Sequence, residues 1–252
     1  MWSTILIDSH VLVNHVDLYG DEIGSVEYVQ HMGTDLTIVN SARVSFGKEK
    51  EFLDDRDEKL IKYLAEHKHT STFEHNVITF RFKVPLFVRS QHHRHRTWSY
   101  NEISRRYTDV NIEFYEPHQF RTQHKSNRQA SNEEYVNPDL NESVVGKTTV
   151  PVSPNLASDA VRFHHQRSLR LFEQLIENGV CREQARGVLP QNLYTEYYGT
   201  TSLANLMKFI ELRTHEGAQW EIQQVAIACL EIAKSRWPIA VQAYQDALFE
   251  HN

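Results

Sequence analysis

The chain has 252 residues, of which 40% are hydrophobic and 24% are charged, and this ordinary globular composition excludes a disordered or collagen-like protein. Its formal net charge of -6 argues against a protein that coats nucleic acid non-specifically, because such proteins present a basic face. The length suits one main domain, and no apolar run approaches the roughly 20 residues that span a bilayer. The opening MWSTILIDSH has no basic segment before an apolar stretch, so we expect a cytoplasmic protein rather than a secreted or membrane protein.

The first third of the chain carries three periodic segments. Residues 26–40 predict an opening strand, whose buried positions are expected to be Leu36, Ile38 and Val39. Residues 54–67 predict a helix with three aspartates in its first turn, where the helix dipole favours acidic side chains. Strict alternation over residues 77–84 predicts a strand that buries every second side chain. Pro85 ends this strand and is well placed to begin a helix that runs to Gln91.

The rest of the chain is predicted to be mainly helical. Residues 94–107 are expected to form an ordered loop, residues 112–115 a short strand, and residues 119–153 a polar surface insertion without a period. Apolar spacing and stop signals predict the later helices at 157–177, 182–188, 191–198, 202–214, 218–237 and 238–249. Strands followed by helices predict an α+β fold with a central antiparallel sheet and a helical C-terminal half. The chain lacks the GxGxxG and GxxxxGK[ST] loops that a Rossmann or P-loop protein needs to hold phosphate.

The densest chemistry lies in RHRTWSYNEISRRY, residues 94–107, which is strongly cationic inside an acidic chain. A charge concentrated against the sign of the whole protein indicates a pocket for an anion. Guanidinium groups bind phosphate bidentately and stay charged at any relevant pH. Ser104 can donate a hydroxyl to the same phosphate, and Glu102 can accept from a base or a sugar. This mixture matches the parts of a nucleotide, whereas the plain alternative is a solvated basic loop.

Two other chemistries are open for the same residues. His92, His93 and His95 are close enough in sequence to be weighed as zinc ligands, although zinc sites space their ligands for one face and add a carboxylate. We therefore expect no metal. An RNA-binding module would use the basic loop with stacking Trp and Tyr side chains. The net acidity and the lack of a second basic patch count against that module.

Five segments of the sequence together resemble the flavin-dependent thymidylate synthases. Arg94-His95-Arg96, seven residues and then Ser104 matches the signature of that family. The other four blocks follow the order of the family and are SARVSF at 41–46, HTSTFEH at 69–75, ARGVLP at 185–190, and LR with AQWEI at 212–222. The resemblance covers most of the chain, and only the polar insertion is longer than in the shorter members.

The resemblance implies an enzyme that converts deoxyuridylate (dUMP) to thymidylate (dTMP), with methylenetetrahydrofolate as the one-carbon donor and tetrahydrofolate as the second product. It implies FAD as cofactor, NADPH as reductant and no cysteine nucleophile. It also implies a homotetramer whose active sites are shared between subunits, with residues 1–252 as a single domain and neither nucleic acid nor membrane as a partner. The order of the methylene and hydride transfers, and the choice of NADPH over NADH, stay open.

The resemblance also assigns roles by position. Arg213 matches the catalytic arginine that stabilises the ionised N3 of uracil, which suits a fixed cation beside a weakly acidic imide. The implied dUMP contacts are Gln91, Arg94, Glu102, Ser104, Arg105, Arg106, Arg186 and Arg213. The implied FAD contacts are Ser71, Arg94, His95, Arg96, Glu102, Ser202, Ala204 and Lys208. His69 matches a position that contacts the folate.

Two places depart from the family pattern. Ser202 and Ala204 stand where the family often has Asn and Arg, so polar contacts to FAD are lost there, while Lys208 could face a flavin phosphate as a point charge. The usual histidine before Ala-Gln-Trp is Gly217. Whether His215, two residues earlier, takes over that flavin contact is left open.

The two cysteines are far apart, so the chain offers no disulfide scaffold, CxxC redox centre or cysteine-built zinc site. Cys229 lies in an apolar run and is expected in the core. Cys181 lies at a predicted helix start, where its pKa could be lowered. It is the one feature that favours the cysteine-dependent thymidylate synthases, the nearest rival by product, which need a nucleophilic cysteine near a histidine.

Overall fold

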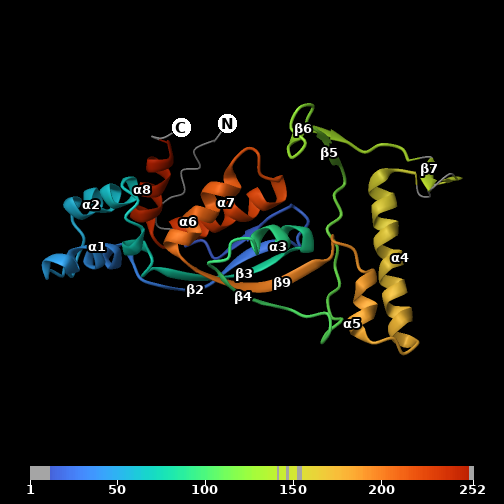
Figure 1. Cartoon of the computed structure of the whole chain (residues 1–252), viewed down its shortest axis with the longest axis horizontal. Coiled ribbons are helices and arrows are strands. Elements are labelled where there is room, and N and C mark those ends of the chain that lie inside the picture. Colours follow the sequence, from blue (N-terminus) through green and yellow to red (C-terminus); the bar gives the residue numbers. More distant parts are fainter. Residues whose placement is uncertain (1–11, 141, 146–147, 152–154, 250–252) are drawn as a thin grey trace. The chain divides into compact units, whose positions relative to one another are not determined.

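The computed structural model of the chain describes residues 12–140, 142–145, 148–151 and 155–249. They belong to two compact units. The first unit comprises the chain up to Lys83, Gln91–Asn101, and the chain from Glu196 onward. The second comprises Val84–Ser90 and Glu102–Thr195. Figure 1 labels the helices and strands, and none of the described helices is long and apolar enough to cross a membrane.

A five-stranded sheet organises the core. Its strands are β1 (His15–Asp17), β2 (Ser25–Met32), β3 (Val77–Pro85), β4 (Ser99–Glu102) and β9 (Tyr194–Ser202), in the spatial order β1-β2-β3-β9-β4. β2 pairs antiparallel with both β1 and β3, and Val26 lies opposite Phe82. The strand predicted at 77–84 is confirmed, since the side chains of its alternating apolar residues are fully buried, namely Ile78, Phe80, Phe82 and Val84. The expected mixed fold with a central antiparallel sheet is therefore confirmed.

The helices of the first unit cover this sheet and extend beyond its end. They are α1 (Asp35–Arg43), α2 (Asp55–Glu66), α6 (Leu203–Thr214), α7 (Trp220–Lys234) and α8 (Pro238–Phe249), with α3 (Leu86–His92) starting in the second unit. Figure 1 shows α6 and α7 side by side over the sheet, while α2 packs on α8. Most of them match the predicted ranges to within two or three residues. Asp54 caps α2 by accepting from two backbone N–H groups, and Ser202 caps α6.

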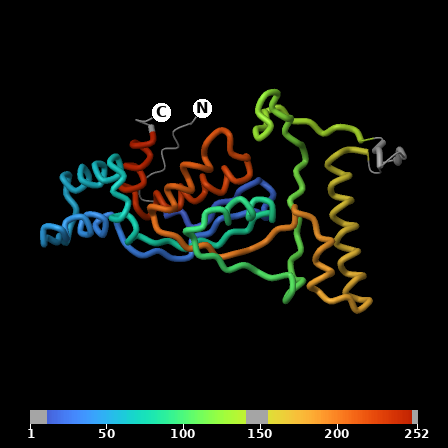
Figure 2. The backbone as a smooth tube through the Cα atoms, in the orientation of Figure 1, coloured from blue at the N-terminus to red at the C-terminus, as the bar shows by residue number. Residues whose placement is uncertain are grey.

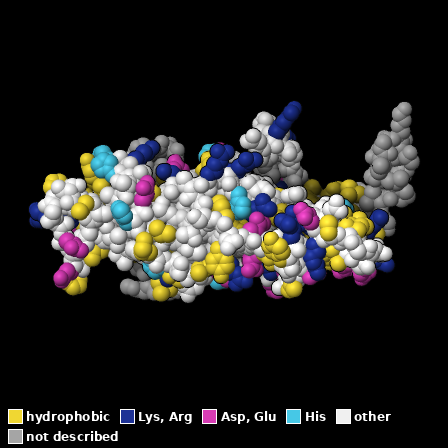
Figure 3. Space-filling model, turned by 60° about the horizontal axis from the view of Figure 1, so that its bottom comes forward, with side chains coloured by type: hydrophobic (Ala, Val, Ile, Leu, Met, Phe, Trp, Pro, Cys, Tyr) yellow, Lys and Arg dark blue, Asp and Glu magenta, His cyan; other side chains and the backbone are white. Residues whose placement is uncertain are grey.

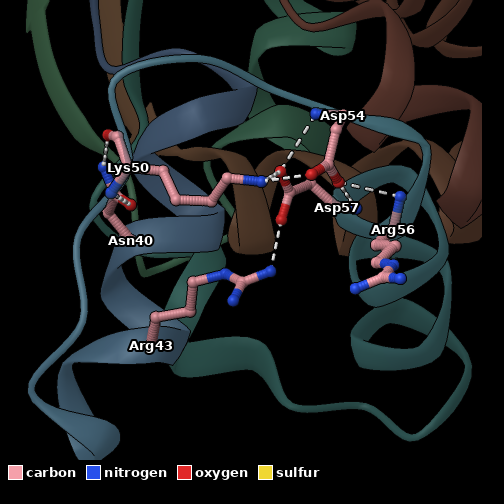
Figure 4. A network of polar contacts seen from close by, with 6 residues as sticks. All are labelled: Asn40, Arg43, Lys50, Asp54, Arg56 and Asp57. Carbon is pink, nitrogen blue, oxygen red and sulfur yellow. Dashed lines mark hydrogen bonds and ion pairs between the residues drawn. The ribbon is translucent and has the colours of Figure 1, made fainter.

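A buried ion-pair network ties α1 to α2 (Figure 4). The carboxylate of Asp57 is fully buried and accepts from Arg43 Nη2 at 2.5 Å and from Lys50 Nζ. The side chain of Asn40 exchanges two 2.9 Å hydrogen bonds with the backbone of Lys50. Burial by itself would raise the pKa of Asp57, but the hydrogen bonds from Lys50, the Asp54 backbone and Arg43 lower it to about 2. The aspartate is therefore held as an anion between two cations.

The predicted opening strand is wrong over its second half. β2 ends at Met32, the chain turns at Gly33 with a φ of 87°, and α1 begins after Thr34. Thr34 and Thr37 form a capping box, in which the Thr34 N–H donates to the Thr37 hydroxyl at 3.0 Å. Two of the three predicted buried residues are buried, but on a helix and not on a strand, namely Ile38 and Val39. The local capping chemistry outweighs the β-branched composition of the segment.

The helix predicted at 191–198 is also wrong, because these residues enter β9. Tyr and Thr make up most of β9, and every second residue from Thr195 to Thr201 is buried, which is the pattern of a strand. Gly199 permits close packing there, since a Cβ at this position would lie 2.8 Å from the Phe82 ring. The loop predicted at 94–107 contains β4, and the strand predicted at 112–115 is reduced to one bridge between Phe114 and Leu193.

The second unit contains one long helix, α4 (Ala157–Glu177), at the predicted bounds. The helix predicted at 182–188 is instead a single α-turn, α5 (Arg182–Ala185), followed by a 3-10 turn. The polar insertion forms two hairpins, which pair β5 (Phe120–Gln123) with β6 (Ser131–Val136) and β7 (Glu142–Val145) with β8 (Thr148–Pro151). Figure 2 traces this backbone through the insertion, part of which lies outside the described residues.

Candidate functional site

A cavity of about 590 Å³ in the second unit brings together half of the predicted dUMP contacts. It is lined by Glu102 and Ser104 at the end of β4, by Arg105, and by Arg186 and Gly187 of the turn after α5. The signature segment and the ARGVLP block therefore reach the same cavity although they are far apart in sequence. Its wall combines cations, a hydroxyl and a carboxylate, which suits a phosphorylated ligand with polar groups.

Glu102 is held in a fixed orientation in this cavity. Its Oε1 accepts from Arg89 Nε at 3.0 Å and from the Thr195 hydroxyl at 2.7 Å. Arg89 lies on α3 and Thr195 on β9, and neither was singled out in the sequence. Arg89 could have been suspected, because it precedes the signature by five residues. Thr195 could not, because its segment was predicted to be a helix.

The arginines near this cavity differ in what they already contact. Arg105 donates to the carbonyl oxygens of Val110 and Asn111 at 2.6 and 3.1 Å, so it fixes its own loop. Arg106 does not line the cavity and lies 3.7 Å from the Glu183 carboxylate. Arg186 is exposed, and its side chain has no hydrogen-bond or ion-pair partner among the described residues. Of the three, Arg186 has its donors available for an anion.

In the first unit, two predicted site residues contact each other directly. Arg213, in the last turn of α6, donates from Nε to Nε2 of His95 at 3.1 Å and from Nη2 to the carbonyl oxygen of Gln91 at 3.3 Å. Burial, and then the charge of Arg213, lower the pKa of His95 to about 4. His95 is therefore neutral near pH 7. Since its Nε2 accepts from Arg213, its proton lies on Nδ1.

His92 is a packing residue. It is fully buried among aromatic rings, including those of Phe82 and Phe209, and its Nδ1 contacts the Tyr197 hydroxyl at 2.8 Å. Burial, and then the neighbouring His95, His93 and Arg213, lower its pKa well below the usual value. Within the described residues, no group of three or more His, Cys, Asp or Glu side chains is placed to hold a metal ion.

Several predicted FAD contacts of the first unit are cations without a partner. Arg94, Arg96 and Lys208 are exposed, and the described residues offer none of their side chains a hydrogen bond or ion pair. Lys208 and Ala204 line a second cavity of about 240 Å³, with Tyr244 among its walls. Of the three cations only Lys208 lines this cavity, and cations whose donors are not engaged suit the diphosphate of a dinucleotide such as FAD.

The remaining predicted contacts of the first unit are occupied locally or exposed. Ser202 caps α6, with its hydroxyl 3.1 Å from Asn205 Nδ2. Ser71 lies exposed on the 3-10 helix Thr70–Phe73, and His69 lies exposed just before it, with its ring edge-on to that of Tyr63. His215 accepts from the backbone N–H of Gly217 at 3.0 Å, so its Nδ1 is engaged in its own turn.

The cysteines differ in exposure. Cys181 is exposed, and its thiol lies 3.7 Å from the Gln184 amide oxygen, not next to a histidine. Cys229 is buried in the core as expected, and burial raises the pKa of its thiol.

Comparisons with known proteins show the family of the chain. Residues 27–239 match the family model described as "Thymidylate synthase complementing protein". A protein from Thermus thermophilus named flavin-dependent thymidylate synthase is 43% identical over 227 residues, which are 90% of this chain and 77% of that protein. The chain belongs to the flavin-dependent thymidylate synthase family. This confirms the resemblance drawn from the sequence and the expectation of an enzyme.

Another member of the family and a solved structure are also similar to the chain. The flavin-dependent thymidylate synthase of Kosmotoga olearia is 40% identical over 226 residues, or 88% of this chain and 90% of that protein. The crystal structure of the UMP/dUMP methylase PolB from Streptomyces cacaoi, bound with 5-Br dUMP, superposes with a TM-score of 0.73 at 31% identity. That match covers 92% of this chain and 97% of the other.

Proposed function

We propose that the chain methylates dUMP to dTMP, with methylenetetrahydrofolate as the one-carbon donor, FAD as cofactor and NADPH as reductant, and releases tetrahydrofolate. The family membership supports this proposal, as does the similarity to a methylase of UMP and dUMP. The observation that carries it is the cavity of the second unit, where Glu102, Ser104 and Arg186 meet. Those three groups match the phosphate and the polar sugar or base atoms of a nucleotide.

In this proposal, Arg186 and Ser104 bind the dUMP phosphate. Arg186 has its donors unengaged among the described residues, and it can form the bidentate, charge-assisted hydrogen bonds that phosphate accepts best. The backbone N–H of Arg106 donates to the Ser104 oxygen at 3.3 Å, which leaves the Ser104 O–H free to donate to the phosphate. Glu102, held by Arg89 and Thr195, accepts from an N–H or hydroxyl of the nucleotide.

Arg213 stabilises negative charge on the uracil ring. Its Nε and one Nη2 hydrogen are engaged by His95 and Gln91, so the guanidinium is fixed before the ligand arrives, with its other N–H groups available. A fixed, half-buried cation favours the anionic form of the uracil imide and needs no rearrangement during the reaction. Burial lowers the pKa of Arg213, but a guanidinium stays charged near neutral pH.

The residues of the first unit fit FAD. Arg94, Arg96 and Lys208 would bind its phosphates, Ser71 its polar atoms, and Ala204 would pack against it without a polar contact. Ser202 and His95 complete the proposed contacts of this unit, and Glu102 of the second unit is a further proposed contact. When bound, FAD supplies the hydride that completes the methyl group. The side chains bind and orient the reactants, and no protein nucleophile is part of the proposal.

Two further parts of the proposal come from the family resemblance. His69 contacts the folate, and four copies of the chain form a homotetramer that shares its active sites. Membership of the family supports both statements. A cytoplasmic location and a single domain over residues 1–252 stay predictions from the sequence.

Flavin content and substrate-dependent reductant use test the proposal together. The purified protein should be yellow, with about one FAD per chain, and dUMP should stimulate its oxidation of NADPH in the presence of methylenetetrahydrofolate. A colourless protein that FAD does not reconstitute, or NADPH oxidation that ignores dUMP, would contradict it.

The surface charge does not favour the RNA-binding alternative. The face drawn in Figure 3 carries acidic side chains beside the basic ones, and not the continuous basic surface of a nucleic-acid-binding protein.

A further inference from the structure

A chain of hydrogen bonds in the first unit runs from a buried carboxylate to Gln91, a proposed dUMP contact. Glu221 is 4% exposed and lies in the first turn of α7. Its Oε2 accepts from Nε2 of Gln219 at 2.8 Å. The Oε1 of Gln219 accepts in turn from Nε2 of Gln91 at 2.5 Å. Three side chains thus connect the start of α7 to the end of α3.

The carboxylate of Glu221 determines which way each amide in this series of hydrogen bonds must point. A carboxylate accepts hydrogen bonds and does not donate them, and Oε2 of Glu221 accepts from Nε2 of Gln219. Gln219 must therefore turn its NH₂ group to Glu221 and its oxygen to Gln91. For the same reason Gln91 must turn its NH₂ group to Gln219, which leaves its own Oε1 without a partner among the described residues.

We propose that Glu221 and Gln219 are positioning residues that orient the Gln91 amide so that its oxygen, and not its NH₂ group, faces the nucleotide. This inference rests on the proposed function and adds a specificity device to it. A fixed acceptor selects a ligand that brings a hydrogen-bond donor. While its uracil ring is neutral, dUMP has two such groups, the ring N3–H and the 3′-hydroxyl. An amide free to rotate would present a donor as readily as an acceptor.

The backbone of Gln91 gives the arrangement a second role. Its carbonyl oxygen accepts from Arg213 Nη2 at 3.3 Å, so one residue holds the catalytic arginine with its main chain and presents an acceptor with its side chain. Reversing the side-chain amide leaves the carbonyl and His95 in place beside Arg213. We therefore expect a reversal to weaken dUMP binding much more than it slows turnover.

Gln219→Lys is the variant that reverses the amide. The new ammonium can pair with Glu221, but it only donates, so Gln91 must turn its oxygen toward it and its NH₂ group toward the nucleotide. Calorimetry with the flavin-loaded protein should show about tenfold weaker dUMP binding, while kcat stays within about twofold. A simple charge effect predicts the opposite, because an added cation would strengthen the binding of an anion.

Two further variants separate orientation from damage. The exchange Gln219→Glu with Glu221→Gln keeps the net charge and still offers Gln91 an acceptor, so its dUMP affinity should stay within about threefold of the parent. Gln224→Lys places the same charge on α7 outside the chain of hydrogen bonds and should not weaken binding. In a Gln91→Ala background, Gln219→Lys should cause no further loss, because the amide that it reverses is absent.

The dUMP affinities of these variants distinguish the orientation inference from the proposed function. If the parent binds dUMP and Gln219→Lys binds it equally well or more tightly, the orientation inference is wrong while the proposed function stands. The orientation inference is also wrong if Gln219→Lys weakens dUMP binding further in the Gln91→Ala background. The same holds if the exchange variant loses as much dUMP affinity as Gln219→Lys. Failure of the parent to bind dUMP would overturn both. The analogue of dUMP that lacks the 3′-hydroxyl shows which ligand group donates to Gln91. If the donor is the 3′-hydroxyl, removing it should weaken binding to the parent but not to Gln219→Lys. If the donor is N3–H, the two proteins should lose affinity equally.

Discussion

Arg213 and His95 form a hydrogen bond of 3.1 Å in which the guanidinium donates and the imidazole accepts. The sequence assigned these two residues to different ligands, the arginine to the uracil ring and the histidine to the flavin. Their contact means that the orientation of the proposed catalytic cation depends on the protonation state of a neighbour. It also gives the histidine of the signature a role within the protein itself.

The first prediction concerns the charge of His95. Because burial and Arg213 lower its pKa to about 4, its imidazole should stay neutral from pH 8 down to about pH 5. A histidine whose folded pKa lies below its unfolded value contributes stability above about pH 6.5, and this contribution is lost as the pH falls toward 4. Histidine resonances followed by NMR check this, with His95→Gln to assign the signal. A titration midpoint of His95 near pH 6.5 would contradict its burial against Arg213.

The second prediction concerns Arg213 itself. Arg213→Ala should lower turnover by at least about 100-fold, the loss expected when a fixed group that stabilises developing charge is removed, and should leave the FAD absorbance largely intact. Arg213→Lys keeps a charge but not the geometry that engages His95 and Gln91, so it should recover only a small part of the activity. Steady-state kinetics at saturating dUMP measure both. Turnover of Arg213→Ala at the parental rate would show that its assigned role is wrong.

The third prediction separates phosphate binding from ring binding. Arg186→Ala should weaken dUMP binding by about 10- to 100-fold, the loss of charge-assisted hydrogen bonds, while binding of the unphosphorylated nucleoside stays unchanged. Arg182 provides a matched control, because it lies on the neighbouring turn and pairs with Asp109 at 2.8 Å. Arg182→Ala should change dUMP affinity by less than about threefold. Equal losses in the two variants would mean that general charge, and not a phosphate contact, is responsible.

The fourth prediction addresses covalent catalysis. Cys181 is exposed and lies beside Gln184, so Cys181→Ala should retain activity to within about twofold. Trapping experiments should likewise recover no covalent adduct between the thiol and dUMP. A folded but inactive variant would indicate a sulfur nucleophile and favour the cysteine-dependent mechanism.

The fifth prediction concerns stability outside the site. Asp57→Asn should lower the free energy of unfolding by roughly 1–3 kcal/mol near pH 7, less than for a fully buried pair, because Arg43 and Lys50 are 27% and 26% exposed. A folded-state pKa of about 2 makes this contribution present above about pH 4 and lost as the pH falls through 2. Urea unfolding of both proteins between pH 2 and 7 tests this. A difference that does not shrink in acid would point to packing rather than charge.

The sequence predicted the elements in which local signals and packing agree. The alternation from Ile78 to Val84 could have only one buried face, and the apolar spacing of α4 defined its bounds. The sequence-based predictions were wrong where tertiary contacts determine the secondary structure. Residues 191–198 are as compatible with a helix as with a strand until Phe82 is known to pack against Gly199. The helix after Gly33 depends in the same way on Asp35, which accepts from the backbone of Ile239 and Ala240 more than 200 residues away.

In the candidate site, too, the sequence identifies the residues of motifs but not those whose role depends on tertiary contacts. The signature segment identifies Glu102 and Ser104 as functional, and the later block at 212–222 identifies Arg213, because few other proteins need those residues at that spacing. They say nothing of Arg89 and Thr195, which orient Glu102, because their contact depends on how α3, β4 and β9 meet. Arg43 shows the opposite case. It belongs to a family block and yet pairs with buried Asp57, so a motif residue can serve the fold.

The folate product tests the central claim most directly. The proposed reaction takes its hydride from reduced FAD, so the folate should leave as tetrahydrofolate. Incubation with dUMP, methylenetetrahydrofolate and NADPH, followed by chromatography and mass spectrometry, should give dTMP and tetrahydrofolate in equal amounts. The appearance of dihydrofolate with dTMP, or of no dTMP from a flavin-loaded protein, would contradict this account.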